Sequence, residues 1–499
     1  MADNSKKIPP QQETHNLLAL YQNGQSDNAM KLAKSMTLSY PNDPFAWKIL
    51  AALLHKEGRL SEGLVANRKL ATLVPNDSKI LNNLGMLILE TGGEVKEALA
   101  FFKKAIALQP DYALAYYNVG CIHKLASNFL EALVYFKKAI ALQPNYFIAY
   151  CQSGDAFYEL GRSEEAYDAY QQTIALDPGY ADAYVGLARV QSLVPGKLSD
   201  AMASYQKALA LDPDHKEGAY LVATSLLVNT GEYEKAIKLL KSIGNYRDSS
   251  SWILRCLYKL NDPSALYEHL NELFDQEITS AMIGNVCCNA ELKYGVPTTN
   301  PFCREPINYI THTDLSCQYN FEKIFVQPIR GILDNPSTWY KDQGRLTSGQ
   351  QTAGNIFSGT NNPQINEIEN IIRLEVGNYQ RHFKASDEGI IRKFPAKYVI
   401  RGWIINMKSG GKLAPHYHEY GWISGSVYVN VPPRHEEDSG NLVLRQGDIE
   451  HQANIKETSV MVVTGSLCLF PASLEHFTIP FDSDENRIVI AFDVVPDPS

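Results

Sequence analysis

A repeated block of 34 or 35 residues dominates the first half of this chain. The block ends in similar motifs, such as AIALQPDY and AIALQPNY. Proline suits the first turn of a helix and disrupts a helix interior, so each proline separates two helices. A period of this length predicts helical pairs that stack on their neighbours. The prolines that mark the repeat are Pro41, Pro75, Pro110, Pro144, Pro178 and Pro213.

Small residues recur at fixed places inside these blocks. Glycines and alanines let two antiparallel helices approach closely, and aromatic side chains fill the gaps between pairs. The pattern resembles the tetratricopeptide repeat, and the resemblance covers residues 10–245, or about seven helix pairs. Such arrays offer a concave groove to peptides or proteins, and we expect a protein or peptide partner there. The recurrent small residues are Gly85, Gly120, Gly154, Gly186, Ala98, Ala132, Ala166 and Ala201, and the candidate groove residues are Asn83 and Asn118.

The repeat loses its phase after residue 245. Residues 246–316 read as further helices followed by a stretch rich in proline and turn residues. We predict a helical and irregular linker over 246–316.

From residue 317 the hydrophobic period changes from that of a helix to the alternation of strands. Short apolar stretches are separated by Gly, Pro, Asp and Ser, and one helix, 365–383, precedes most of them. This pattern predicts an antiparallel sandwich or jelly roll over 317–499, with the helix covering one sheet. The expected strands are 397–407, 422–432, 441–447, 459–471 and 487–496.

Three histidines stand out in this second half. His416 and His418 are two residues apart, so on a strand they point to the same face. His476 follows an apolar strand and a turn, and a jelly roll can place it beside the first two. Three converging imidazoles suit Fe, Zn or Cu, whereas a surface pair and an unrelated loop histidine would bind no metal. Arg487 begins the last expected strand and can pair with an anionic ligand.

The second half resembles the 2-oxoglutarate- and Fe(II)-dependent oxygenases, and in particular an oxygenase group often fused to tetratricopeptide repeats. The resemblance implies a double-stranded β-helix, with His416 and His476 as Fe(II) ligands and Arg487 as partner of the far 2-oxoglutarate carboxylate. Tyr428 and Asn406 would bond 2-oxoglutarate or substrate. The matching residues are Trp403, Asn406, Gly410, Gly411, His416, His418, Trp422, Ser424, Gly425, Tyr428, Val429, Gly440, Leu442, Leu469, Phe470, Pro471, His476, Pro480 and Arg487.

The third metal ligand departs from the usual pattern of this superfamily. Most members have a carboxylate two residues after the first histidine, and here that residue is His418. His418 can itself be the ligand, Glu419 can reach in, or a third ligand can be missing. We prefer His418, although Glu419 stays open at this point.

The resemblance implies an enzyme, a hydroxylase that couples decarboxylation of 2-oxoglutarate to succinate with oxidation of a C–H bond. The helical array ahead of it suggests a protein or peptide substrate, brought to the iron by the repeats. Two other functions remain open. One is a cupin-like metal enzyme that does not use 2-oxoglutarate, since the HxH spacing partly fits that family as well. The other is a scaffold whose barrel is catalytically dead.

The composition of the chain and the motifs that it lacks argue against several other classes of function. The net charge is −9, which argues against binding to nucleic acid or anionic membranes. No run of 18 apolar residues or signal-peptide core occurs, so we expect a cytoplasmic protein. Phosphate-binding P-loops, dinucleotide-binding glycine motifs, the hydrolase G-x-S-x-G and the zincin HExxH are absent from the sequence.

Overall fold

The computed structural model describes residues 8–194, 196–227, 230–336, 338, 340–341, 344–358, 362–434, 436–447 and 455–497. Its internal contacts divide the chain into two compact units, Met1–Ala156 and Phe157–Ser499. The division falls within a helix of the repeats and not at the expected boundaries 245/246 and 316/317. The reason is that the later helices pack into the same unit as the β domain.

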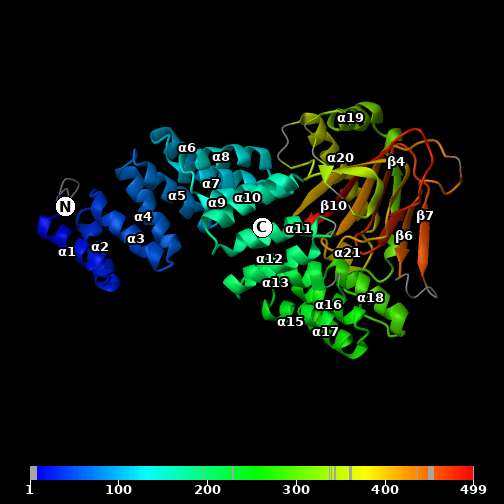
Figure 1. Cartoon of the computed structure of the whole chain (residues 1–499), viewed down its shortest axis with the longest axis horizontal. Helices are drawn as coiled ribbons and strands as arrows, with labels where there is room; N and C mark the ends of the chain where they lie inside the picture. The colour runs from blue at the N-terminus through cyan, green and yellow to red at the C-terminus, as the bar shows by residue number, and fades with distance from the viewer. Residues whose placement is uncertain are drawn as a thin grey trace. The chain divides into compact units, whose positions relative to one another are not determined.

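The first unit consists of antiparallel helix pairs (Figure 1). Small residues set the close approach within a pair, as the sequence predicts. A Cβ atom on Gly85 would lie 2.7 Å from the Phe102 ring, and one on Gly120 would lie 2.5 Å from the Phe136 ring. The helices are α1 (Gln11–Gln22), α2 (Ser26–Ser39), α3 (Pro44–Lys56), α4 (Leu60–Leu73), α5 (Ser78–Glu90), α6 (Val95–Leu108), α7 (Ala113–Leu125), α8 (Phe129–Leu142) and α9 (Phe147–Glu159).

The second unit opens with helices that continue the pairing and extend into the expected linker. A single apolar cluster joins the last repeats to the helices of residues 249–294. Among the described helices, none combines the length and apolar character needed to cross a bilayer. The elements are α10 (Ser163–Leu176), α11 (Ala181–Ser192), α12 (Leu198–Leu211), α13 (Lys216–Leu221), η2 (Val222–Leu227), α15 (Tyr233–Ser242), α16 (Ser249–Lys259), α17 (Pro263–Asp275) and α18 (Ala281–Tyr294).

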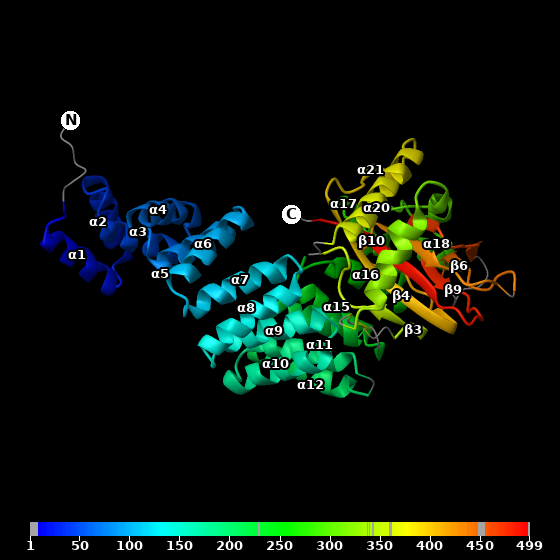
Figure 2. The same ribbon diagram turned by 90° about the horizontal axis from the view of Figure 1, so that it is seen from above.

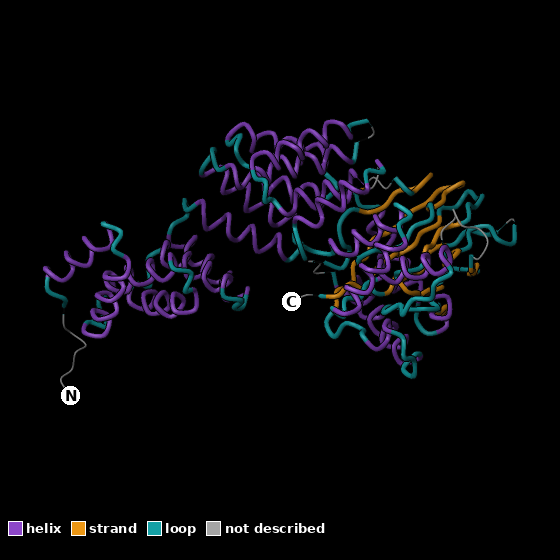
Figure 3. The backbone as a smooth tube through the Cα atoms, turned by 90° about the horizontal axis from the view of Figure 1, so that it is seen from below, coloured by secondary structure: helices purple, strands orange, loops and turns teal. Residues whose placement is uncertain are grey.

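Two antiparallel sheets form the rest of this unit, and Figure 3 shows the strands gathered in the C-terminal part of the chain. The larger sheet has the order β1-β8-β5-β10-β4-β3-β2, and the smaller has the order β7-β6-β9. Their facing sides share one apolar cluster, to which Tyr428 and Phe470 contribute from the larger sheet and Leu444 from the smaller. The strands are β1 (Thr311–Asp314), β2 (Tyr340–Lys341), β3 (Leu346–Thr352), β4 (Tyr398–Leu413), β5 (Ile423–Asn430), β6 (Leu442–Gln446), β7 (Lys456–Val460), β8 (Ser466–Pro471), β9 (Glu475–Thr478) and β10 (Arg487–Pro496).

The β domain contains more strands than the sequence predicts, because β1, β2, β3 and β9 were not expected. The predicted strand 459–471 is two strands, because Gly465, at φ +97°, turns the chain from β7 in one sheet to β8 in the other. The domain also begins before residue 317, since β1 pairs with β8. β1 has the polar sequence THTD, which lacks the apolar alternation that identifies a strand.

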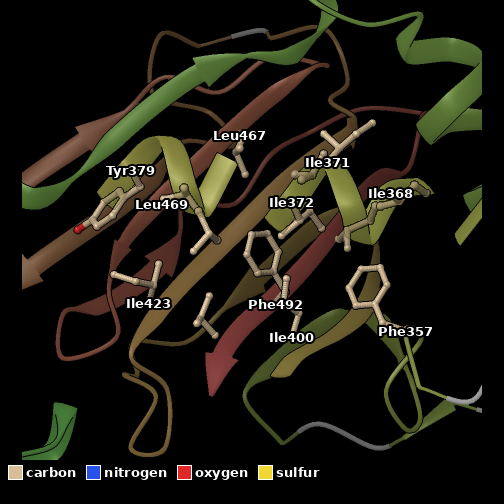
Figure 4. Packing of buried hydrophobic residues seen from close by; sticks show 14 of the residues in the cluster. Phe357, Ile368, Ile371, Ile372, Tyr379, Ile400, Ile423, Leu467, Leu469 and Phe492 are labelled. Atoms are coloured by element: carbon tan, nitrogen blue, oxygen red, sulfur yellow. The ribbon is translucent and has the colours of Figure 1, made fainter. Parts of the chain in front are cut away.

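One long helix covers the outer face of the larger sheet. α20 (Pro363–His382) corresponds to the predicted helix 365–383 and lies across β10 and β4 in Figure 2. Its buried residues Ile368 and Ile372 belong to the same cluster as Ile400, Ile423 and Phe492 of the sheet (Figure 4). The shorter elements here are η3 (Pro306–Tyr309), η4 (Leu315–Cys317), η5 (Glu322–Val326), α19 (Gln327–Leu333) and α21 (Gly389–Arg392).

Strand alternation then decides which residues face the inner side of the sheet. On β10, Ile490 and Phe492 join the cluster under α20, whereas Val489 and Ala491 line the space between the two sheets. This inner side is where a site can form. The architecture confirms the predicted fold class, an all-α repeat array followed by a jelly-roll domain.

Candidate metal centre

Three histidine side chains converge at the inner side of the jelly roll. Ligand nitrogens of His416, His418 and His476 all lie within 4.8 Å of one another. His476 lies on β9, and its backbone pairs with that of His416, with N–H···O distances of 3.1 and 2.7 Å. The segment that carries His416 and His418 follows β4 and is not a continuous strand. The predicted cluster therefore forms, although only His416 among the two has strand-like pairing.

Each of these rings has an oxygen acceptor at its Nδ1 atom. His416 Nδ1 lies 2.9 Å from the Ala414 carbonyl, His476 Nδ1 lies 3.3 Å from the Leu474 carbonyl, and His418 Nδ1 lies 2.6 Å from Asp493 Oδ1. A proton donated from Nδ1 to each oxygen leaves the other nitrogen, Nε2, with a lone pair. Acceptors of this kind fix the tautomer and orientation of metal-binding histidines.

Burial and mutual repulsion keep two of the rings neutral. Burial first, and then the neighbouring His418, lower the pKa of His416 to about 3. Burial and the other two rings lower the pKa of His476 well below its usual value. For His418 burial acts in the same direction, but the charge and hydrogen bond of Asp493 outweigh it and raise the pKa. Neutral imidazoles with free lone pairs are the form that binds a metal ion.

The carboxylate of Glu419 is engaged elsewhere. Its Oε1 atom accepts a 2.7 Å hydrogen bond from Arg255 Nη1 on α16. Among the described residues, only the three histidines form a group that can hold a metal ion. The geometry thus places His418, and not Glu419, beside His416 and His476.

Arg487 lies in the same cavity and carries a charge without a local counterion. It is the first residue of β10 and only 1% exposed. Nη1 donates to the Gly440 carbonyl, the guanidinium lies 5.1 Å from the centre of the Tyr428 ring, and Nε has no hydrogen-bond partner. No carboxylate pairs with Arg487 within the part of the chain that the structure describes. A buried cation of this kind favours an anionic ligand.

The cavity between the sheets holds five of the six predicted site residues. Around the histidines and Arg487 it leaves about 40 Å³, which is room for a metal ion and a few water ligands. Its lining residues are Trp403, Ile405, Met407, Leu413, His416, His418, Ser426, Tyr428, Leu442, His476, Thr478, Arg487, Val489 and Ala491.

Asn406 is the predicted residue that the structure does not bring to this cavity. It lies between Ile405 and Met407 on β4, and those two neighbours line the cavity. Alternation therefore directs Asn406 to the opposite face, the side of the sheet that α20 covers.

Two residues support the site without having been assigned a role from the sequence, Asp493 and Ser424, although Ser424 is among the residues that match the oxygenase pattern. Asp493 accepts from His418 Nδ1 and also from Ser424 Oγ, at 2.7 Å. The two residues face each other across β10 and β5. A signal was present, because Asp493 is the single charged side chain within the apolar run IVIAFDVV.

The first unit contains a separate groove. It has a volume of about 630 Å³ and combines apolar side chains with asparagines and cations. Both candidate groove residues line it, but Asn118 is buried and donates to Asn82 Oδ1 at 2.8 Å, whereas Asn83 is exposed. The groove is also lined by Lys48, His55, Lys79, Met86, Glu90 and Leu114.

Models of known protein families match both halves of the chain. A family model described as "Putative 2OG-Fe(II) oxygenase" matches residues 401–493. Tetratricopeptide-repeat models match residues 78–112, 113–146, 154–192 and 195–252. No curated protein matches the chain.

Several solved structures are similar to part of the chain. A tetratricopeptide repeat protein from Parabacteroides merdae is 20% identical, with a TM-score of 0.43, covering 49% of this chain and 99% of its own. MamA from Desulfovibrio magneticus RS-1 is 20% identical, with a TM-score of 0.31, covering 34% of this chain and 96% of its own. PilF from Pseudomonas aeruginosa is 22% identical, with a TM-score of 0.35, covering 39% and 90%.

Proposed function

We propose, from the premise that this chain joins tetratricopeptide repeats to a domain of the 2OG-Fe(II) oxygenase family, that it is a 2-oxoglutarate- and Fe(II)-dependent dioxygenase. It hydroxylates a protein or peptide side chain that the repeats recruit. One observation carries the proposal. Three imidazoles with acceptor-bonded Nδ1 atoms and a buried, unpaired arginine face the same cavity.

The donor set fits the implied cofactors. Three imidazole nitrogens suit a first-row divalent ion and leave coordination positions for other ligands. His416, His418 and His476 would hold Fe(II), and Arg487 would pair with the far carboxylate of 2-oxoglutarate through its guanidinium. When bound, Fe(II) and 2-oxoglutarate supply the oxidising chemistry, in which O₂ is consumed and 2-oxoglutarate is converted to succinate and CO₂.

The protein's own residues then bind, orient and exclude water. Asp493 and the two backbone carbonyls hold the rings in the ligating orientation. Ile405, Leu413 and Val489 give the cavity apolar walls. In such surroundings a charge pair with Arg487 is stronger than in water, so the site favours a dianionic cosubstrate. Tyr428, whose ring lies against the guanidinium, holds that guanidinium in place.

The repeats are the reason for proposing a protein or peptide substrate. Tetratricopeptide repeats generally bind proteins, and the 630 Å³ groove presents Asn83, Lys79 and Leu114 to such a ligand. Binding there raises the local concentration of a tethered side chain at the oxygenase domain. An Asn83→Ala and Lys79→Ala double variant should raise KM for the protein substrate and leave turnover of 2-oxoglutarate without substrate unchanged. We propose no nucleic-acid or membrane ligand, and a cytoplasmic location.

Succinate formation tests the oxygenase proposal. Anaerobically purified, Fe(II)-loaded protein is given 2-oxoglutarate and then O₂, beside His476→Ala and Arg487→Ala. We expect succinate from the wild type and a loss of at least tenfold in both variants. The matched control is Arg373→Ala, because Arg373 lies on α20, pairs with Glu369 of the same helix at 2.7 Å and does not line the cavity.

Each alternative function has its own outcome in this experiment. Iron bound at one per chain with no succinate, with or without candidate protein substrates, would favour a cupin-like metal enzyme. Absence of both iron and succinate would favour a scaffold with a catalytically dead barrel.

A further inference from the structure

The side chains of the segment 416–420 contact two different parts of the second unit. His416 and His418 belong to the histidine cluster. Tyr417 packs instead against the apolar cluster of the helices, and Glu419 and Tyr420 also contact helical residues. The ligand-bearing segment is thus shared between the jelly roll and the helical array.

Arg255 on α16 makes the central contact with this segment. Its Nη1 donates to Glu419 Oε1 at 2.7 Å, and its guanidinium lies 5.8 Å from the centre of the Tyr417 ring and 5.0 Å from that of Trp252. The Arg255 and Glu419 side chains are 26% and 22% exposed. An arginine held by both a carboxylate and two ring faces has little freedom, so it fixes the position of what it binds.

Other helical residues contact the end of this segment at Tyr420 and the chain just before His476. Tyr220 on α13 hydrogen-bonds Tyr420 between hydroxyls at 2.9 Å, and it donates to Asp248 Oδ1 at 2.5 Å. Asn285 on α18 donates to the Ser473 carbonyl at 2.9 Å, three residues before His476. α18 also lies beside β6 in Figure 1. Both segments that carry histidines are therefore anchored from helices.

The ligand segment needs such support because the sheets hold it weakly. Between the end of β4 at Leu413 and the start of β5 at Ile423, the segment belongs to no named strand. His416 pairs with His476, and the His418 N–H donates to the Ala472 carbonyl at 3.1 Å. His418 lies between two residues that Arg255 contacts, so a shift of Tyr417 or Glu419 would move His418 as well.

We propose that Arg255 is a positioning residue for the metal centre. From a helix outside the oxygenase family match, it acts through Glu419 and Tyr417 to hold His416 and His418 at ligating distance. This inference rests on the metal site of the proposed function. It adds that the helical array, and not the jelly roll alone, completes that site.

Cobalt binding to the full chain tests the proposal without turnover. Co(II) serves as a spectroscopic substitute for Fe(II), and its dissociation constant and visible absorption are measured for wild type, Arg255→Ala, Arg255→Lys and Glu419→Gln. Changes to the supports of metal ligands typically weaken binding by about 10- to 100-fold. We expect that loss and an altered spectrum for Arg255→Ala, and a smaller loss for Arg255→Lys. Combining Arg255→Ala with Glu419→Ala should weaken binding little beyond Arg255→Ala alone.

Arg189→Ala is the matched control. Arg189 on α11 likewise pairs with a carboxylate, Glu159 at 3.2 Å, and its guanidinium lies 4.1 Å from the centre of the Tyr158 ring. It should leave Co(II) binding unchanged. Wild-type affinity and spectrum in Arg255→Ala would overturn the inference, and if that variant fails to fold, the same result in Glu419→Gln would overturn it. A wild type that binds no Co(II) would instead refute the metal site and the proposed function together.

Discussion

At the scale of single residues, Arg487 places a buried positive charge in the cavity. It is fully buried, contacts a carbonyl and a ring face, and lacks an acidic partner among the described residues. The pKa of its guanidinium is lowered by this burial. An anion that enters the cavity would restore the balance, and the residue is therefore the natural place to test cosubstrate binding.

Arg487→Ala should weaken 2-oxoglutarate binding strongly. Truncation of one partner in a buried charge pair costs about 2–5 kcal/mol, or about 30-fold to a few thousand-fold in affinity. Arg487→Lys should recover part of the loss, because it restores the charge but not the planar fork. Calorimetric titration of the Co(II)-loaded protein measures this. Equal affinities in wild type and Arg487→Ala would show that the carboxylate binds elsewhere.

The histidines give the metal-free protein a defined acid sensitivity. The pKa of His416 is about 3 in the folded state and about 6.5 when unfolded. Between these values only the unfolded chain binds the proton, so the stability is complete above pH 6.5 and is lost as the pH falls toward 3. The slope approaches about 1.4 kcal/mol per pH unit for this one group. The other groups of the chain add their own slopes.

Comparison with His416→Gln isolates the contribution of this histidine. Urea unfolding of both proteins in chelator, from pH 7 to pH 4, should show the stability of wild type relative to the variant falling on acidification. A constant difference across that range would mean that His416 is not buried in its neutral form.

At the scale of elements, local sequence patterns predicted most of the jelly roll but not the supports of its site. Strand alternation identified β4, β5, β6 and β10, and it placed Arg487 at the start of β10. The polar β1 was missed because its pairing with β8 is a long-range contact without a local apolar pattern. The contact of Arg255 with Glu419 joins residues 164 positions apart in the chain, so no local periodicity could reveal it.

The α20 helix offers a direct test of how the larger sheet is held. Ile372 is fully buried against the sheet, whereas Leu374 on the same helix is 51% exposed. Ile372→Ala should lower the free energy of unfolding by about 2–5 kcal/mol through lost burial and the resulting cavity. Leu374→Ala should change it by less than about 0.5 kcal/mol. Chemical denaturation measures both, and equal effects would contradict the packing of α20 on β10 and β4.

At the scale of the whole molecule, the compact unit that carries the three clustered histidines begins far ahead of the jelly roll. The unit Phe157–Ser499 includes the later repeats, the helices α16–α18 and both sheets. The sequence boundaries were set at residue 246, where the repeat loses its phase, and at residue 317, where the hydrophobic period changes from that of a helix to that of strands, but loss of a pattern does not imply loss of packing. A fragment 317–499 would lack β1 and every helix that contacts residues 417–420.

The fragments 157–499 and 317–499 should therefore differ strongly in folding and in Co(II) binding. We expect residues 157–499 to fold and bind Co(II) with an affinity within threefold of the full chain. Residues 317–499 should be poorly soluble or bind Co(II) at least tenfold more weakly. Circular dichroism and Co(II) titration measure these properties. Full affinity in 317–499 would show that the jelly roll completes its own metal centre.

The central claim is that the three histidines and Arg487 form one site for Fe(II) and 2-oxoglutarate. The most direct measurement is anaerobic visible absorption of the Fe(II)-loaded protein during addition of 2-oxoglutarate, since chelation of Fe(II) by a 2-oxo acid produces a charge-transfer band. We predict a saturable band in the wild type, no band in His476→Ala, and a band in Arg487→Ala that requires much more 2-oxoglutarate. Absence of the band from wild-type protein that holds one Fe(II) per chain would contradict the account.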